Sequence, residues 1–516
     1  MKEYKSAIFF ACIVFASYLF MANFSRAEVK AEEKTNISSP SAQEVLTISL
    51  KDAIPMALKH NEALKVEQVT PFIRQTYEEQ EKSLFDPVLS MEISHSTEKS
   101  QQTSTNSGAK STIKDEQTEA EVGVFQLFPT GTKVSLGFTE DREWSDFYGD
   151  QHTSRVGLTL TQALLQGAGL KVNSVRIDQA RLDTFSSRYE IQSFTENLVS
   201  EVEKTYWDFA LAQKQIEIFT ESLRLAEQQM KETEERIQVG TLAQTEFAAA
   251  QAEVALRRED SINARFDLAK IRLKLLRLLN PPGASLWNKK VVLLDHPAVP
   301  QITLDTIESH VEAALQLRSD LNQARLELQR GDLEVVKTKN GLLPKLDFFI
   351  TMGKTGYADS FSDSVKDIDG EGYDILAGLT LEYPFGWKDE KARHKRALLV
   401  YSQAEKVVNN LAQLVQIDVR TAYIEVNRTQ EQVTATAATR TFQEEKLRAE
   451  TEKFKVGKST TLLVAQTQRD LVASRISEIK AMVSYLKALV ELYRLEGSLL
   501  NRRGISSPAA ASKSHP

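Results

Sequence analysis

The stretch that decides the fold of this chain is residues 202–240, VEKTYWDFALAQKQIEIFTESLRLAEQQMKETEERIQVG. An apolar side chain stands at every seventh position: Val202, Phe209, Ile216, Leu223, Met230 and Ile237. Such a heptad stripe predicts a helix that buries a narrow seam against partner helices and supercoils left-handedly. Gly240 follows where a helix can end with a left-handed cap. Since no Pro or Gly interrupts residues 172–239, the helix would run for about 100 Å.

The same pattern recurs 217 residues later without a gap. After Gly240 a return run carries heptad positions at Phe247, Val254, Leu268 and Leu275. Adding 217 to every position gives the second set: Val419, Val426, Val433, Arg440, Leu447, Phe454, Val464, Leu471, Tyr485 and Leu492. Only Arg440 departs from the stripe. The sequence therefore predicts one long helical hairpin that occurs twice. Heptads alone fit a cytoplasmic coiled-coil rod equally well, but the rest of the chain argues against it.

The first 27 residues have the composition of a secretory signal peptide. Lys2 and Lys5 precede an apolar run over residues 7–24, and Ser25-Arg26-Ala27 offers small residues for cleavage after Ala27. The alternative is an uncleaved membrane anchor, because the run is nearly long enough to span a bilayer.

Composition narrows the function classes. The chain has 516 residues and a net charge of −7, and this mild acidity argues against a nucleic-acid partner. Its only cysteine, Cys12, lies in the predicted signal, so we expect no disulfide framework, thiol catalysis or cysteine metal site in the mature chain. No later stretch approaches ~20 apolar residues, so a mature chain that enters a membrane would need a closed β-barrel.

Two regions have the period-two alternation of strands. Each follows a proline, Pro87 or Pro344, and the motif Gly157-Leu158-Thr159-Leu160 recurs at residues 378–381. The predicted strands are 88–95, 120–128, 133–140, 154–162, 345–352 and 373–383. Polar loops are expected at 97–117 and 358–370. The first half is longer by one hairpin that turns at Pro129-Thr130-Gly131, and the sequence leaves open whether this hairpin joins a barrel.

These patterns predict a duplicated architecture. An entry helix over residues 50–84 has an echo 257 residues later, and each copy continues through strands into a long hairpin. The boundaries that we predict are a signal peptide 1–27, a flexible leader 28–45, a first repeat 46–280, a linker 281–303, a second repeat 304–502 and a disordered tail 503–516.

In this order of elements the chain resembles the TolC-like outer membrane efflux proteins. The resemblance rests on Ala57-Leu58-Lys59-His60-Asn61, the strand openers Leu84-Phe85-Asp86-Pro87 and Leu342-Leu343-Pro344, Leu158-Thr159-Leu160-Thr161-Gln162, and the two Val-Gly tips. It covers about Val45 to Arg502.

The resemblance implies a mixed α and β membrane protein. Long antiparallel helical hairpins would form a coiled-coil tunnel across the periplasm, and strands from three chains would share one transmembrane β-barrel in the outer membrane. It also implies a passive exit duct for tripartite efflux or type I secretion. The partners would be a periplasmic adaptor protein, an inner-membrane pump of RND or ABC type, and outer-membrane lipid.

The same resemblance assigns roles to the hairpin tips. Val239, Gly240, Val456 and Gly457 would contact the adaptor at the periplasmic end, which would open by untwisting of the hairpins. Acidic residues near the tips would line the aperture: Glu234, Glu235, Glu444, Glu445, Glu450 and Glu452. The alternative is that they form a solvated helix face with Lys446, Arg448 and Lys453.

No constellation of residues suggests catalysis. The seven histidines are scattered without ligand spacing, and Met352-Gly353-Lys354-Thr355 lacks the first glycine of a phosphate loop. We therefore expect no enzyme activity, cofactor or metal. A second function remains open, namely a periplasmic coiled-coil scaffold or adaptor without a barrel. The two differ in whether the strands face lipid.

Overall fold

The computed structural model describes residues 45–103, 110–146, 149–283, 286–300 and 302–506. Residues 46–287 and 291–506 belong to one compact unit, which contains all the long helices and strands described. The predicted signal peptide, most of the predicted leader and the end of the predicted tail lie outside the described residues. The domain boundaries thus remain predictions.

The first half contains two entry helices, four long strands and a helical hairpin. Its elements are β1 (Val45–Ile48), α2 (Leu50–His60), α3 (Glu62–Lys82), η1 (Ser83–Phe85), β2 (Val88–Thr103), β3 (Lys110–Leu127), β4 (Thr132–Ser145), β5 (Gly149–Ala163), α4 (Leu170–Asn173), α5 (Val175–Gln238), α6 (Thr245–Leu279), η2 (Leu286–Asn288) and β6 (Lys290–Leu293).

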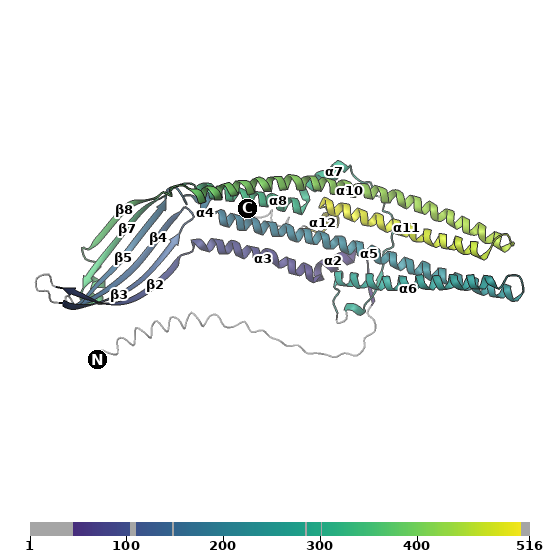
Figure 1. The fold of residues 1–516 in the computed structure, drawn as a ribbon, viewed down its shortest axis with the longest axis horizontal. Helices are drawn as coiled ribbons and strands as arrows, with labels where there is room; N and C mark the ends of the chain where they lie inside the picture. Colours follow the sequence, from purple (N-terminus) through teal and green to yellow (C-terminus); the bar gives the residue numbers. More distant parts are fainter. Residues whose placement is uncertain (1–44, 104–109, 147–148, 284–285, 301, 507–516) are drawn as a thin grey trace, which may run out of the picture. The chain divides into compact units, whose positions relative to one another are not determined.

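The second half repeats this order with two long strands fewer (Figure 1). Its elements are α7 (Ile307–Leu317), α8 (Ser319–Asn340), β7 (Lys345–Ala358), α9 (Phe361–Asp367), β8 (Tyr373–Glu382), α10 (Lys388–Lys455), α11 (Thr461–Glu496) and α12 (Leu499–Arg502). The long helices α5 and α10 contain 64 and 68 residues. The predicted internal duplication is confirmed.

The predicted entry helix over residues 50–84 is wrong in one respect, because the chain breaks it into α2 and α3 at Asn61. Asn61 adopts an extended conformation, its N–H donates to the Ala57 carbonyl oxygen at 2.9 Å, and its Oδ1 accepts from the Leu64 N–H at 3.0 Å. One residue thus ends one helix and caps the next. Arg318, 257 positions later, is also extended and separates α7 from α8.

The long strands form one antiparallel sheet in the order β2-β3-β4-β5-β7-β8. The extra hairpin of the first half is therefore part of the sheet, because β3 and β4 pair with each other and with β2 and β5. The predicted loop at 97–117 is wrong over most of its length. Strand β2 continues to Thr103, and β3 begins at Lys110. The predicted loop at 358–370 contains the short helix α9. Polar composition misled the prediction because polar side chains occupy both faces of the strand ends.

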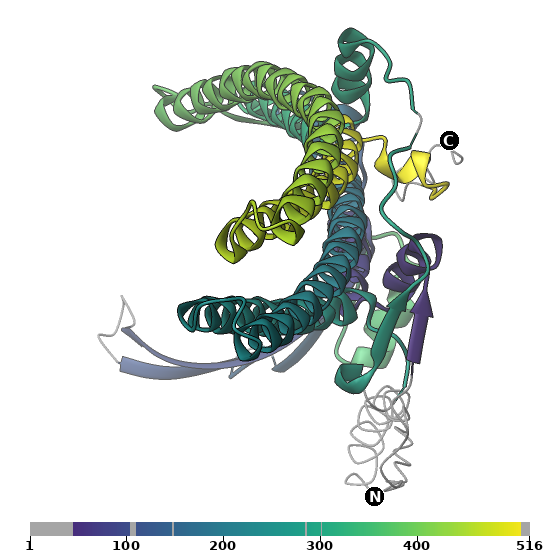
Figure 2. The same ribbon diagram turned by 90° about the vertical axis from the view of Figure 1, so that its right-hand side faces the viewer.

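The helices pack side by side in a row. Near the sheet, α3 packs against α5, α5 against α8, and α8 against α10. Further from the sheet, the two hairpins meet where α5 packs against α11 (Figure 1). Figure 2 shows the row as a curve rather than a closed bundle. Consequently α3 and α10, at the two ends of the row, each keep one side without a neighbour among the described elements.

The core lies midway along the helices, where the heptad seam is deepest. Val202, Phe209, Val419 and Val426 are buried there, whereas Ile216 and later seam positions of α5 are only half-buried. Heptad burial is thus strongest far from the hairpin tips.

Tyr206 ties the linker between the two repeats to this core. Its fully buried hydroxyl donates to Asp295 Oδ2 at 2.8 Å, and the Leu50 N–H donates to the same oxygen at 2.7 Å. Each of these contacts joins segments far apart in the sequence, so the linker and the first entry helix are fixed together on α5.

We predict that Arg503→Ala lowers the free energy of unfolding by about 3 kcal/mol. Glu203 is fully buried in α5, and Arg503 Nε and Nη2 each lie 2.6 Å from its carboxylate oxygens. Removing the arginine leaves a buried charge without its partner. Circular dichroism during urea unfolding measures the effect. The control is Lys270→Ala, which removes an exposed pair with Asp267 worth ~0–1 kcal/mol. Equal losses in the two variants would contradict the prediction.

Candidate functional site

The sheet has one apolar face, which follows directly from its register. Paired residues in an antiparallel sheet lie on the same face. One continuous row crosses all six strands, and all six of its members are exposed large hydrophobic residues: Leu89, Val124, Leu136, Leu158, Met352 and Ile375. Neighbouring rows add further exposed apolar side chains: Met91, Val122, Val156, Phe348, Leu379 and Leu381. An apolar face exposed to this extent fits contact with lipid.

The opposite face of the sheet is polar and acidic. Carboxylates stand directly opposite each other in three cross-strand pairs: Glu92 with Glu121, Glu98 with Asp115, and Glu119 with Asp141. Such pairs disfavour the sheet and lower the local potential, so a polar passage along this face would attract cations.

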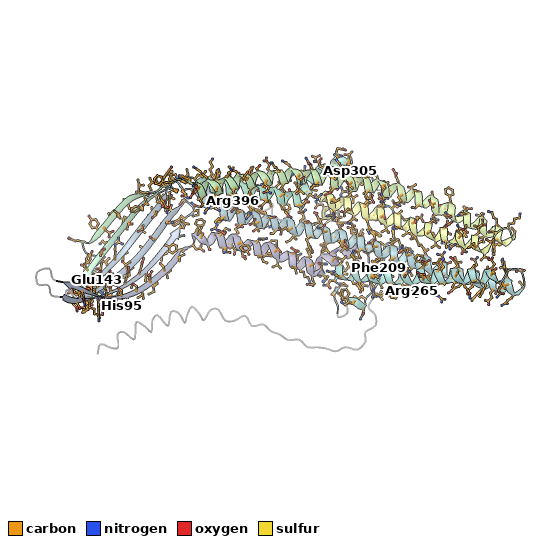
Figure 3. All side chains as sticks on the ribbon, viewed as in Figure 1. His95, Glu143, Phe209, Arg265, Asp305 and Arg396 are labelled. Atoms are coloured by element: carbon orange, nitrogen blue, oxygen red, sulfur yellow. The ribbon has the colours of Figure 1, made fainter. Side chains whose placement is uncertain are left out.

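Arg155 provides positive charge on the polar face. It crosses β7 to reach Asp374 on β8, with Nη2 2.7 Å from Asp374 Oδ2. The side chain passes over Gly353, where an added Cβ would lie 2.6 Å from Arg155 Nη2. A side chain at position 353 would therefore push the Arg155 and Asp374 side chains away from their present positions. Figure 3 labels Glu143 and His95 at the end of the sheet far from the helices.

Aromatic side chains mark the junction between β8 and α10. The Tyr383 ring packs edge-on against Phe385 and Trp387, with centroid separations of 5.7 and 5.5 Å. Phe385 is 97% exposed, so this cluster is not part of the core. Aromatic residues at the rim of an apolar face are typical of a membrane–water boundary. Arg396 lies a few turns into α10 (Figure 3).

Both hairpin tips have the same backbone geometry. In the first, the Gly240 N–H donates to the Ile237 carbonyl at 3.0 Å and the Thr241 N–H to the Arg236 carbonyl at 2.8 Å. Gly457 and Lys458 repeat both bonds, and the two glycines have φ values of +76° and +73°. This is a Schellman motif, which requires a left-handed residue that glycine adopts without strain.

The tips leave apolar side chains in solvent. Val239 and Val456 are 73% and 68% exposed, and no atom lies within 4 Å of a Cβ placed on Gly240 or Gly457. The predicted tip residues thus lie at two equivalent, accessible corners. The two hairpins touch near them, because the Arg236 guanidinium lies 5.1 Å from the Phe454 ring centroid.

A cavity separates the hairpins just behind the tips. It has a volume of about 370 Å³ and lies between α5, α6 and α11. Small residues line much of it, including Ala226, Ala250 and Ala465. The hairpins are therefore loosely packed at this level.

The acidic residues near the tips are mostly paired within the chain. Glu444 accepts from Arg475 at 3.2 Å and from Arg440 at 2.9 Å, and these guanidinium groups lower its pKa against the opposing effect of desolvation. The remaining pairs are Glu445 with Arg448, Glu450 with Lys453, and Glu452 with Lys455.

Glu450 differs from the others because it is buried. Its carboxylate accepts hydrogen bonds from Ser459 and Lys453, which lower its pKa. These contacts connect the end of α10 to the turn that follows it. Glu234 and Glu235 are exposed on α5.

The apolarity of the helices and the grouping of possible metal ligands can also be stated for the described residues. Among the described helices, none has the length and apolarity needed to cross a bilayer. Among the same residues, no group of three or more His, Cys, Asp or Glu side chains is arranged to hold a metal ion.

A sheet with one apolar and one polar face, continuing into paired helices of more than 60 residues, has the architecture of a membrane-anchored duct. The family model described as outer membrane efflux protein matches residues 54–281 and 310–498. The chain belongs to the outer membrane efflux protein family.

Individual relatives agree with this assignment. Outer membrane protein TolC of Vibrio cholerae is 23% identical over 351 residues, which are 66% of this chain and 76% of that protein. The outer-membrane channel OprN superposes with a TM-score of 0.66 at 15% identity, over 87% of this chain and 90% of its own. VceC from Vibrio cholerae superposes with a TM-score of 0.64 at 14% identity, over 87% of this chain and 96% of its own. The structural matches show the fold.

Membership defines what the chain does. It is a transport protein of the outer membrane that extends into the periplasm, and it serves as the exit duct of an efflux system. It is not an enzyme, as predicted. Sequence reasoning missed the Arg155–Asp374 pair and helix α9. In the sequence, only Gly353 and Gly356 pointed to these features. A Cβ at Gly353 would meet Arg155 and Asp374, and a Cβ at Gly356 would meet the backbone of α9.

We predict that Gly457→Ala destabilises the second tip by about 1 kcal/mol, because alanine tolerates a positive φ poorly. Gly457→Asn is expected to cost less. Hydrogen exchange of the tip amides measures the loss as faster exchange. The control is Gly331→Ala in helix α8, where a Cβ would contact Tyr401 at 3.7 Å and helix propensity favours alanine. Unchanged exchange in Gly457→Ala would refute the prediction.

A second prediction concerns Glu196, which is 5% exposed in α5. Burial raises its pKa from 4.5 to about 7, although Gln192 donates to it at 3.0 Å. The folded chain therefore holds this proton more tightly than the unfolded chain, so stability falls as pH rises from about 4.5 to 7, by roughly 3 kcal/mol. Glu196→Gln should flatten this dependence in urea titrations at several pH values. Glu190→Gln, an exposed change on the same helix, should leave it intact. A parallel slope in Glu196→Gln and the unmodified chain would count against the assignment.

Proposed function

We propose that three copies of this chain close head to tail into one duct whose hairpin tips dock a periplasmic adaptor. The adaptor would connect the duct to an inner-membrane pump of RND or ABC type, for tripartite efflux or type I secretion. The observation that carries this proposal is a pair of apolar helix edges that no other described element covers.

The first edge lies on α3 and the second on α10. Exposed apolar residues of α3 are Val66, Val69, Phe72, Ile73 and Tyr77, and those of α10 include Leu398, Leu399, Val400, Val407 and Leu414. These helices stand at opposite ends of the row. Two different edges that cover each other give a heterologous contact, which closes into a ring when the rotation permits.

The two edges also match in level and charge. Phe72 lies ten residues before the end of α3, and Leu398 ten residues after the start of α10, so both stand about 15 Å from the sheet. Closer to the sheet, Glu79 of α3 and Lys391 and Lys395 of α10 are exposed, with no salt-bridge partner among the described residues. Opposite charges at one level favour this pairing.

The same ring would close the sheet. Its edge strands are β2 and β8, and three six-stranded sheets would supply eighteen strands. Joining β2 of one copy to β8 of the next satisfies the free backbone groups of both edges, which lipid requires. The apolar face would then contact lipid, and the acidic face would line the passage.

At the periplasmic end, the proposal assigns adaptor contact to Val239, Gly240, Val456 and Gly457. Their exposure and their equivalent geometry in the two repeats support this role. Of the predicted aperture residues, exposed Glu445 and Glu452 are the better candidates to line the opening with Glu444, because Glu450 is buried.

The test is cross-linking in isolated outer membranes. We predict that Phe72→Cys combined with Leu399→Cys, in a chain whose Cys12 is replaced by serine, gives a trimer-sized band on denaturing gels after treatment with a short bis-maleimide. The matched control pairs Phe72→Cys with Ile424→Cys, which lies about 38 Å further along α10. A soluble monomer, or equal cross-linking in both pairs, would refute the ring and favour a periplasmic scaffold.

A further inference from the structure

The short helix α9 lies on the apolar face of the sheet, at its end far from the helices. It packs against β7 and β5. Ser364 Oγ lies 2.7 Å from Ser154 Oγ, and a Cβ on Gly356 would be 2.1 Å from the Ser364 carbonyl oxygen. The backbone of α9 thus rests directly on β7, and Asp367 fixes it there by accepting from the Tyr357 N–H at 3.0 Å.

The rows of paired side chains on this face of the sheet change from apolar to polar at the level of α9. The row that contains Val156 is apolar on β2 to β5 and ends in Lys354 and Tyr373, two residue types that reach from lipid to the aqueous boundary. The next row outward contains Glu140, Ser154 and Gly356. Glu140 is buried there and accepts from Ser154 and from His152 at 2.8 Å. Helix α9 covers the first polar row beyond the apolar ones.

The distance from the aromatic junction agrees with a membrane boundary at this row. Gly356 follows Leu346 by ten residues along β7. Ten residues of strand span ~34 Å, or ~26 Å across the membrane at a strand tilt of about 40°. The apolar band of an outer-membrane sheet is about 25 Å tall. The aromatic cluster and α9 are therefore separated by roughly one band height.

The helix itself is amphipathic. Its sheet side carries Ser364 and Asp367. Phe361, Val365 and Ile368, at helical spacing, form an apolar edge, and the first two are 48% and 38% exposed. Ser362, Asp363 and Lys366 form a polar edge, on which Lys366 pairs with Asp363 at 3.0 Å. Since α9 covers β5 and β7 rather than the edge strand β2 or β8, the proposed ring leaves it uncovered.

We propose that α9 is an interfacial anchor: its apolar edge inserts at the boundary between headgroups and acyl chains of the outer leaflet, and its polar edge faces water. The occupant of this surface is lipid, because the apolar edge continues the apolar face of the sheet in a protein of the outer membrane. The inference rests on the proposed orientation of the sheet. Insertion of this edge would fix the depth of the sheet in the outer membrane.

The test is depth measurement with single nitroxide labels. Cys12 is the only cysteine of the chain, so its replacement by serine leaves one thiol in each variant. The full chain carrying Phe361→Cys, Val365→Cys, Ser362→Cys or Leu379→Cys is reconstituted in vesicles of phosphatidylethanolamine and phosphatidylglycerol. Collision rates with oxygen, which partitions into lipid, are compared with those of a water-soluble nickel complex.

The label at 379 should meet oxygen several-fold more often than nickel. Labels at 361 and 365 should give intermediate ratios, and the label at 362 should favour nickel. Nickel access at 361 and 365 equal to that at 362, with 379 still in lipid, would overturn this inference alone. Labels at 361 and 365 that neither reagent reaches would also overturn it, because protein would then cover α9. Nickel access at 379 would instead refute the proposed orientation of the sheet.

Discussion

A helix of more than 60 residues cannot be covered by a single partner, and this constraint governs the structure. Helix α5 packs against α3 and α8 near the sheet and against α6 and α11 further away. Each neighbour buries a different stripe over a different part of its length. The breaks at Asn61 and Arg318 follow from the same constraint, because the entry helices must end where the return helices α6 and α11 take over as neighbours. The Asn61 side chain marks this exchange by donating to the Leu278 carbonyl at the end of α6.

The exchange of neighbours also explains where charge is buried. Midway along the helices, Glu203 with Arg503 and Tyr206 with Asp295 fasten the C-terminal segment and the linker to α5. Lys204 with Glu491 and Lys487 with Asp208 join α5 to α11 at the same level. All of these contacts join segments of the same chain. Near the hairpin tips, by contrast, a cavity of about 370 Å³ lies between α5, α6 and α11.

The sequence was sufficient for the features that depend on periodicity. Heptads at Val202 and its successors indicated the long helices, and Gly240 and Gly457 indicated where they turn. The sequence was insufficient where a single hydrogen bond determines the local structure. The sequence indicated one entry helix over residues 50–84, yet the chain breaks it at Asn61, whose side chain caps the next helix. The polar residues of β2 and β3 indicated a loop, because alternation fails where both faces of a strand are polar. At the tips, the sequence identified the glycines but not that Glu450 would be buried beneath Lys453 and Ser459. That arrangement depends on the path of the turn.

The position of the extra hairpin bears on how such ducts diverge. Strands β3 and β4 enter between β2 and β5 as a unit that leaves the sheet and returns to it, so their removal would leave β2 and β5 antiparallel and free to pair. The inserted pair keeps the alternation of apolar and polar faces across both new junctions. Evolution can therefore change the circumference at the membrane in steps of one hairpin per copy, without altering a helix. The width of the sheet and the length of the helical part can therefore change independently, although one chain encodes both.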